Sequence, residues 1–221
     1  MKTLCLIPAR GTSTRLHRKN LREVGGVPLV RRAVDIALAA QRAGLVEEVF
    51  VSTDDHEIEE LIRPAVRPYW RGRTLDATSN VRDVVVEFLN NRDGESWELV
   101  LNLLPTSPLR TLRTVVQAYR LMAEHDFAHP VMTAVRPRKA PHHMLAQAVD
   151  GLWRVPFPAA GGDFFVHEGG AIWTKPEWLR ADKGFYDRPC LIQDVPPEEA
   201  VDVDTELDLM LAEALWRRAN P

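Results

Sequence analysis

The chain has 221 residues, of which 45% are hydrophobic and 27% charged, and its formal net charge is -3. This balance excludes a wholly disordered chain, and it offers no global positive field for duplex nucleic acid as a partner. Two cysteines exclude a disulfide scaffold and a cysteine-rich zinc site. No apolar run approaches the about 20 residues that span a bilayer, and the first residues do not resemble a secretory signal. We therefore expect a cytoplasmic protein with no membrane partner.

Strand-like and helix-like segments alternate over roughly the first 135 residues. The apolar run Thr3–Ile7 stops at Pro8 and is typical of a central strand that helices cover on both faces. The predicted strands are 3–7, 48–52, 98–103 and 130–135, the predicted helices are 28–43, 55–63, 80–89 and 112–122, and 66–77 is predicted as a loop. The alternation predicts βαβ units, and hence a three-layer, Rossmann-like α/β fold with a mostly parallel twisted sheet.

The stretch 136–168 departs from this pattern, because it is rich in Pro, Gly and His and has weak periodicity. We interpret it as a small lobe inserted into a single domain that spans 1–221. Two further strands are predicted at 170–174 and 190–195, the second at an edge of the sheet. A final helix is predicted from Thr205, with one apolar face formed by Leu207, Met210, Leu211, Ala214 and Leu215.

A basic loop, Ala9–Asn20, follows the first strand. In open α/β sheets, ligands bind beyond the carboxyl ends of the strands, so this loop is the first candidate for a binding site. It carries cationic side chains at 10, 15, 18 and 19, and small residues at 11–14 that let backbone N–H groups approach a ligand. These features fit a polyphosphate, although a solvated basic loop has the same composition. The loop matches neither the Walker A pattern nor the dinucleotide-binding pattern.

Residues 7–16, IPARGTSTRL, together with Lys19-Asn20, resemble the signature of the CMP-sugar synthetases. These are the cytidylyltransferases for nonulosonic acids, such as sialic, pseudaminic and legionaminic acid, and for the octulosonic acid Kdo. The segment STRL is similar to the Kdo enzymes, whereas Lys19-Asn20 is similar to the sialate type. Thr14 stands where the nonulosonate pattern has Lys. The resemblance implies that Arg10, Arg15 and Lys19 are catalytic, and that nucleotide is bound by Ala9, Arg10, Gly11, Ser13 and Asn20.

Two more segments resemble nucleotide-side motifs of this family. Ser52–Asp55 matches its STDD, and Asp76–Asn80 resembles its DTSS segment, which lies beside the nucleotide. Each segment also suits a simpler role, because its polar residues can form the N-cap of the helix that follows. The resemblance adds Ser79 and Arg71 to the expected nucleotide-binding residues, with Arg73 as an alternative to Arg71.

The segments expected to face the sugar depart from the family pattern. Leu104–Arg110, LPTSPLR, resembles QPTSPLR with Leu in place of Gln. Gly169–Trp173, GGAIW, resembles NGAIY with Gly in place of Asn. Physically, the two prolines of the first segment favour a rigid turn at a strand end. The resemblance implies that the sugar is bound by Leu104, Thr106, Ser107, Gly169 and Gly170.

Two carboxylates near the end of the chain suggest a metal site. Asp202 and Asp204 are two apart, so in an extended segment both side chains point the same way and can bind one hard cation. Asp204 alone could instead cap the final helix, and we expect Asp208 to face solvent. The segment Val201–Glu206, VDVDTE, resembles the DIDTEED of the family, in which these positions hold Mg²⁺.

The resemblance as a whole implies transfer of CMP from CTP to the anomeric hydroxyl of an acidic 2-keto sugar, with release of pyrophosphate. Family members are usually dimers, so we expect a homodimer to which the inserted lobe contributes. Two alternatives stay open. The altered sugar side could take a different acid, such as a Kdo-like ulosonate or a phosphonate. The changes at Thr14, Leu104 and Gly169 could also mark a catalytically weakened nucleotide-binding subunit.

Overall fold

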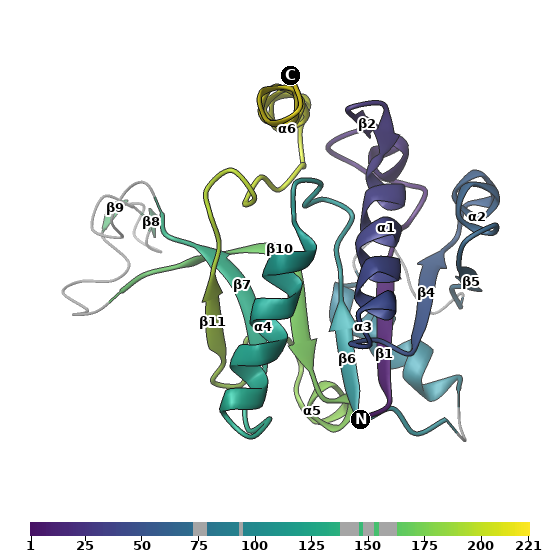
Figure 1. The fold of residues 1–221 in the computed structure, drawn as a ribbon, viewed down its shortest axis with the longest axis vertical. Helices are drawn as coiled ribbons and strands as arrows, with labels where there is room; N and C mark the ends of the chain where they lie inside the picture. Colours follow the sequence, from purple (N-terminus) through teal and green to yellow (C-terminus); the bar gives the residue numbers. More distant parts are fainter. Residues whose placement is uncertain (73–78, 93–94, 138–145, 148–152, 155–162) are drawn as a thin grey trace.

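The computed structural model describes residues 1–72, 79–92, 95–137, 146–147, 153–154 and 163–221. Its centre is a seven-stranded sheet in the order β11-β7-β10-β6-β1-β4-β5 (Figure 1). Neighbouring strands are parallel except at β10, which runs antiparallel to both β6 and β7. The predicted mostly parallel sheet is therefore confirmed. Its strands are β1 Thr3–Pro8, β4 Glu48–Thr53, β5 Arg67–Trp70, β6 Leu99–Asn102, β7 Val131–Val135, β10 Val166–Thr174 and β11 Leu191–Asp194.

Helices cover both faces of the sheet, which gives the three layers. Alternate residues of β1 belong to different cores, because successive side chains of a strand point to opposite faces. Cys5 and Ile7 pack with α1, α2 and α4, whereas Leu4 and Leu6 pack with α3 and α5. Complete burial on both faces explains why the first strand is a continuous apolar run. The helices are α1 Leu29–Arg42, α2 His56–Ile62, α3 Val81–Asn90, α4 Leu112–Glu124 and α5 Pro176–Ala181.

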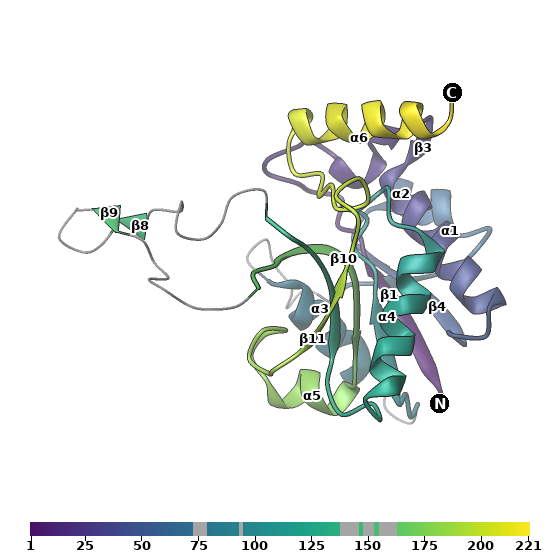
Figure 2. The ribbon, with the colours of Figure 1, turned by 60° about the vertical axis from the view of Figure 1, so that its left-hand side comes forward.

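The last helix, α6 Glu206–Ala219, lies across the edge of the molecule where β1 and β6 end (Figures 1 and 2). It packs on a small hairpin, β2 Glu23–Val24 and β3 Val27–Pro28, through a third apolar cluster. At the hairpin turn, Gly25 has a φ of 59°, and a Cβ there would overlap the Trp216 ring. The C-terminal segment is thereby placed over the loop that follows β1.

The core face of α6 differs from the predicted one. Its buried residues are Leu209 and Ala212, whereas Leu207, Met210 and Leu211 are exposed. The helix carries apolar residues on two sides, so their spacing could not identify which side faces the hairpin. Asn80, predicted as a cap, does cap α3, and Asp83 completes a capping box there.

Two strands also differ from the predictions. The predicted loop 66–77 contains β5, a partly exposed edge strand without an apolar run. The predicted strand 170–174 begins earlier, at Val166, because a bulge between His167 and Ile172 lets Val166 and His167 pair with β7. Residues 166–168, expected in the inserted lobe, therefore lie in the central sheet.

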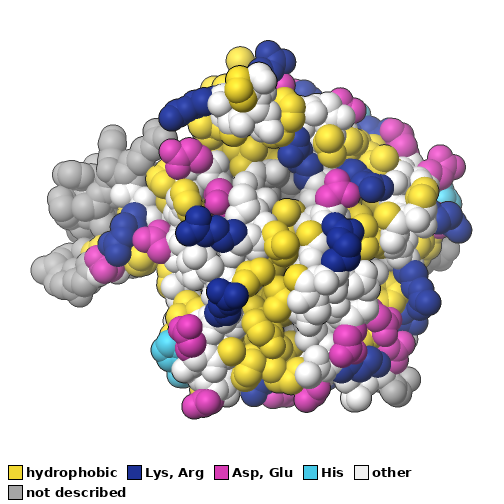
Figure 3. Space-filling model, viewed as in Figure 1, with side chains coloured by type: hydrophobic (Ala, Val, Ile, Leu, Met, Phe, Trp, Pro, Cys, Tyr) yellow, Lys and Arg dark blue, Asp and Glu magenta, His cyan; other side chains and the backbone are white. Residues whose placement is uncertain are grey.

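Part of the inserted stretch is described. Within it, β8 Ala146–Gln147 pairs antiparallel with β9 Trp153–Arg154 in a separate two-stranded sheet. The rest of the expected lobe between 138 and 162 lies outside the described residues, as do Arg73 and residues 76–78. Within the described part of the chain, no helix is long and apolar enough to cross a membrane. Figure 3 shows acidic and basic side chains interspersed on one face of the molecule.

Candidate active site

Three hydrogen bonds fix the loop that follows β1. The Ala9 N–H donates to the Ser52 carbonyl at 2.8 Å, and the Gly11 N–H donates to Asp54 Oδ1 at 2.7 Å. Asn20, buried at the far end of the loop, donates from Nδ2 to the Arg10 carbonyl at 2.8 Å. The loop is thus held by the end of β4 and closed on itself before any ligand binds.

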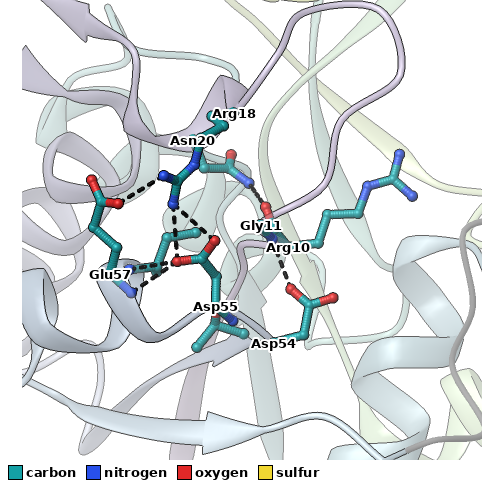
Figure 4. Close-up of polar contacts among 9 residues, drawn as sticks. Arg10, Gly11, Arg18, Asn20, Asp54, Asp55 and Glu57 are labelled. Carbon is teal, nitrogen blue, oxygen red and sulfur yellow. Dashed lines mark hydrogen bonds and ion pairs between the residues drawn. The ribbon is translucent and has the colours of Figure 1, made fainter.

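One basic residue of the loop does not face the others. Arg18, with a φ of 51°, forms ion pairs with Asp55 at 3.0 Å and Glu57 at 2.7 Å. Asp55 is also the N-cap of α2, as the simpler interpretation of the STDD segment expected. Figure 4 shows the Arg18 side chain turned towards these carboxylates and the Arg10 side chain pointing the other way. Arg18 therefore anchors the loop, whereas Arg10 is directed into a cavity.

Two other cations converge on Asp204. Arg15 Nη1 lies 2.7 Å from Asp204 Oδ2, and Lys19 Nζ lies 2.7 Å from Asp204 Oδ1. The Lys19 side chain is only 17% exposed, whereas that of Arg15 is 68% exposed. Lys19 is consequently fixed in the wall, and Arg15 has room to move towards a ligand.

The segment that carries Asp202 and Asp204 is anchored between them. The N–H of buried Val203 donates to the Thr106 carbonyl at 2.7 Å. The N-cap of α6 is Thr205, not Asp204, and Asp208 accepts from the N–H groups of both Asp204 and Thr205. Asp208 is partly exposed and in addition holds this turn, and Asp204 is free of the capping role.

Several surrounding groups act on the pKa of the Asp202 carboxyl. Desolvation by the surrounding protein raises its pKa, and the negative charge of Asp204 raises it further. A hydrogen bond from Thr106 and the charges of Lys19 and Arg15 act in the opposite direction. Additional positive charge beside Asp202 would therefore stabilise its ionised form.

A cavity of about 410 Å³ joins these groups at the carboxyl ends of β1 and β6. Its lining contains both cationic and acidic side chains, and the start of α3 adds apolar ones. The predicted residues that line it are Arg10, Ser13, Arg15, Lys19, Asn20, Arg71, Ser79, Leu104, Thr106, Asp202 and Asp204. Sequence reasoning missed Val81 and Val84, because their helical spacing indicates only a core-facing side.

Arg71 reaches the cavity across the end of β4. Its Nε and Nη2 donate to the Ser52 carbonyl at 3.3 and 3.1 Å, and Nε also lies 3.1 Å from Ser52 Oγ. Burial lowers the pKa of Arg71, and Asp54 counteracts this effect. The side chain is thus a fixed, half-buried cation in the cavity lining.

The remaining predicted residues stand behind the cavity wall. Ala9 is fully buried, and Gly11 holds the loop through its N–H and by its lack of a side chain, since a Cβ there would overlap the Asp55 carboxylate. Buried Ser107 donates to the Glu168 carbonyl at 2.9 Å. Gly169 and Gly170 are buried in the bulge of β10. None of these residues is among those that line the cavity.

The residues present fit a hard divalent cation that a ligand helps to hold. No group of three or more His, Cys, Asp or Glu residues is placed for metal binding within the described residues. Mg²⁺ in proteins is commonly bound by one or two carboxylates together with water and substrate phosphates. Asp202 and Asp204 supply such a pair in the cavity lining, next to cations suited to phosphates.

The model of the family described as "Cytidylyltransferase" matches residues 4–151, more than half of the chain. The chain belongs to the cytidylyltransferase family. This cytidylyltransferase is accordingly a nucleotidyltransferase enzyme. The matched region contains the loop after β1, Arg71, α3 and the segment after β6, but it ends before Asp202 and Asp204.

Two curated relatives match the cytidylyltransferase over almost its whole length. Pseudaminic acid cytidylyltransferase of Campylobacter jejuni is 29% identical, with 98% of this chain and 97% of the relative covered. CMP-N,N'-diacetyllegionaminic acid synthase of Legionella pneumophila is 27% identical, with 97% and 96% covered. Both alignments extend beyond the family match into the C-terminal part of the chain.

Solved structures support the fold of the cytidylyltransferase. A CMP:2-keto-3-deoxy-manno-octonic acid synthetase complexed with CTP has a TM-score of 0.74 at 18% identity and covers 99% of this chain. A 4-diphosphocytidyl-2C-methyl-D-erythritol synthase of Anaerococcus prevotii has a TM-score of 0.71 at 15% identity. At these identities the likeness is one of architecture, and it agrees with the three-layer α/β fold predicted from the alternation of elements.

Proposed function

We propose that this cytidylyltransferase joins CMP from CTP to the anomeric hydroxyl of an acidic 2-keto sugar of the nonulosonic class. The observation that carries the proposal is a single cavity in which Arg10, Arg15 and Lys19 face Asp202 and Asp204. The names of the pseudaminic and legionaminic acid relatives support the class of acceptor.

The reaction exchanges a phosphoanhydride bond of CTP for a phosphate ester bond to the sugar. A bond forms between the anomeric oxygen and the α-phosphorus, and the bond from that phosphorus to the oxygen bridging to the β-phosphate breaks. Pyrophosphate leaves with the electron pair, and the hydroxyl proton is lost to solvent. No covalent enzyme intermediate is required, so positioning and charge stabilisation supply the catalysis.

The chain's own cations would bind and orient the triphosphate. Arg10 points into the cavity, Lys19 is fixed in its wall, and Arg15 has room to move. Ser13 and Asn20 add polar groups to the same cavity, and Arg71 and Ser79, which also line it, would contact the nucleotide. Asp202 and Asp204 would hold Mg²⁺, which when bound supplies neutralisation of phosphate oxygens and polarisation of the attacking hydroxyl.

The proposal is tested by pyrophosphate release with Mg²⁺, across the four nucleoside triphosphates and a panel of acidic 2-keto sugars and phosphonates. Release with CTP and a nonulosonic acid supports it. Release with CTP and only a Kdo-like ulosonate or a phosphonate would move the acceptor outside the proposed class. Binding of CTP without release from any acid would favour a non-catalytic nucleotide-binding subunit.

We further propose that the protein works as a homodimer. The exposed apolar side chains of α6 support this, because Leu207, Met210 and Leu211 lie together on its outer side at helical spacing. Sedimentation equilibrium at micromolar concentration tests the proposal. A mass of one chain at every concentration would overturn it.

A cytoplasmic location is also proposed. Cys5 and Cys190 are free, and Cys5 is completely buried, as suits a reducing compartment. Fractionation of cells producing the tagged chain tests this, and recovery with secreted or membrane fractions would contradict it.

A further inference from the structure

Leu104 forms part of the cavity wall, and Gly169 packs behind its side chain. Leu104 is half-buried and lines the cavity, and Gly169 lies buried behind it. Gly169 has a φ of 76°, and a Cβ built on it would lie only 2.8 Å from Leu104 Cδ1. The absence of a side chain at 169 therefore gives the Leu104 side chain the space in which it rests.

Hydrogen bonds from buried side chains hold the backbone around Leu104 in place. Arg110 Nη2 donates to the Leu104 carbonyl at 2.9 Å, and Ser107 Oγ donates to the Glu168 carbonyl at 2.9 Å. Arg110 and Glu168 are both buried, and the charge of each favours the ionised form of the other. These contacts tie the turn after β6 to the bulge of β10, so the apolar wall is preformed.

This wall stands next to the proposed metal-binding carboxylates. Two residues beyond Leu104, the Thr106 carbonyl accepts the Val203 N–H, and the Thr106 side chain hydrogen bonds to Asp202. If Asp202 is near the reacting atoms, as the proposed function requires, Leu104 faces the acceptor. Its side chain can neither donate nor accept a hydrogen bond.

We propose that Leu104, backed by Gly169, selects acceptors that present an apolar substituent, such as a methyl group, to this wall. The inference rests on the proposed function and specifies its acceptor. A hydroxyl placed against Leu104 would lose its hydrogen bonds to water and gain none from the side chain. Apolar pockets discriminate against an added hydroxyl by about 100-fold at most, so we expect a preference of about 10- to 100-fold.

The test uses matched pairs of acidic 2-keto sugars that differ only by hydrogen or hydroxyl at one carbon. For each pair, kcat/KM is measured with CTP for the wild type, L104Q and the apolar control L104M. We expect the wild type to favour the deoxy member of at least one pair by about 10- to 100-fold. L104M should retain this preference, whereas L104Q should abolish or reverse it. If L104Q does not fold, L104N serves the same purpose.

The outcomes separate the two proposals. Turnover with no preference in any pair, or with the same preference in L104Q, overturns the selective role of Leu104 and leaves the proposed function intact. A preference lost equally in L104Q and L104M also overturns it, because apolarity would then not be the cause. No turnover of any acid by the wild type overturns the proposed function and this inference with it.

Discussion

Lys19 Nζ and Asp204 Oδ1 lie 2.7 Å apart, although 185 residues separate them in the sequence. Arg15 completes the pairing from the other carboxylate oxygen. The cations that would bind a triphosphate thus pair with a carboxylate that would bind a metal. Binding of CTP with Mg²⁺ would exchange these partners: the cations move to phosphate and the carboxylate moves to the metal.

This exchange of partners predicts that one substitution, Lys19→Met, has opposite effects on the affinities for CTP and for Mg²⁺. Lys19→Met should weaken CTP binding by about 10- to 100-fold, because a charge-assisted hydrogen bond to phosphate is lost. The same variant should bind Mg²⁺ more tightly than the wild type in the absence of nucleotide, because Asp204 loses a competing cation. Calorimetric titration of each ligand separately measures both effects.

Arg22→Met provides the matched control for Lys19→Met. Arg22 pairs with Glu206 at 2.6 Å near the same end of α6, but it does not line the cavity. Its replacement should leave both affinities at wild-type values. Weakening of Mg²⁺ binding in Lys19→Met would contradict the exchange.

Gly11→Ala should impair nucleotide binding more than the chemical step. A Cβ at 11 would overlap the Asp55 carboxylate, which also binds Arg18 and caps α2, so the loop would have to shift. We expect KM for CTP to rise by about 10- to 100-fold with a smaller change in kcat. Gly184→Ala is the control, since a Cβ there would make an ordinary 3.7 Å contact. Equal kinetics of the two variants would show that the loop tolerates the shift.

Asp202→Asn should separate activity from stability. The surroundings and Asp204 raise the pKa of Asp202, so its charge is unfavourable in the folded protein and its removal should not lower Tm. Loss of a metal-binding carboxylate should lower kcat/KM by about 100-fold or more. Asp194→Asn, at an exposed carboxylate that pairs with Arg136, should leave kcat/KM unchanged. If the Asp202→Asn variant kept full Mg²⁺-dependent activity, Asp202 would not be a metal ligand.

His167 should make stability depend on pH below neutrality. Burial lowers its pKa from the ordinary 6.5, so the folded chain keeps the ring neutral while the unfolded chain takes up a proton. Its contribution to the free energy of unfolding is complete above pH 6.5 and is lost as the pH falls towards the folded pKa. The loss cannot exceed about 1.4 kcal/mol per pH unit for one group.

Urea denaturation of the wild type and His167→Gln at several pH values measures this effect. Above pH 7 the two proteins should differ by a constant amount, part of which reflects the lost 2.7 Å hydrogen bond between His167 Nδ1 and the Tyr186 hydroxyl. Below pH 6.5 the wild type should lose stability faster than the variant. Parallel curves from pH 8 to pH 5 would show that His167 is protonated equally easily in the folded state.

The sequence allowed the framework, and many of the residues that line the cavity, to be predicted because both depend on local patterns. The run Thr3–Ile7 is apolar throughout since both faces of β1 are buried. The loop Ala9–Asn20 follows the end of a parallel strand, which is where α/β sheets bind ligands. The paired spacing of Asp202 and Asp204 is likewise local, and the structure places both on one cavity.

Features that depend on distant contacts were not predictable in the same way. Arg18 and Lys19 are adjacent cations, yet one meets Asp55 and the other Asp204, because Arg18 adopts a left-handed backbone conformation. Gly169 looked like a lost sugar contact, whereas its positive φ and its packing against Leu104 place it behind the wall. No periodicity or composition encodes either arrangement.

The most direct test of the central claim follows the phosphorus atoms of CTP. CTP labelled at the α- or γ-phosphorus is incubated with the protein, Mg²⁺ and a nonulosonic acid. The account predicts that the α-label enters a phosphodiester with the sugar while the γ-label enters pyrophosphate, in equal amounts and only when the acid is present. Release of γ-label as orthophosphate, or of α-label as free CMP without the acid, would show hydrolysis and contradict the account.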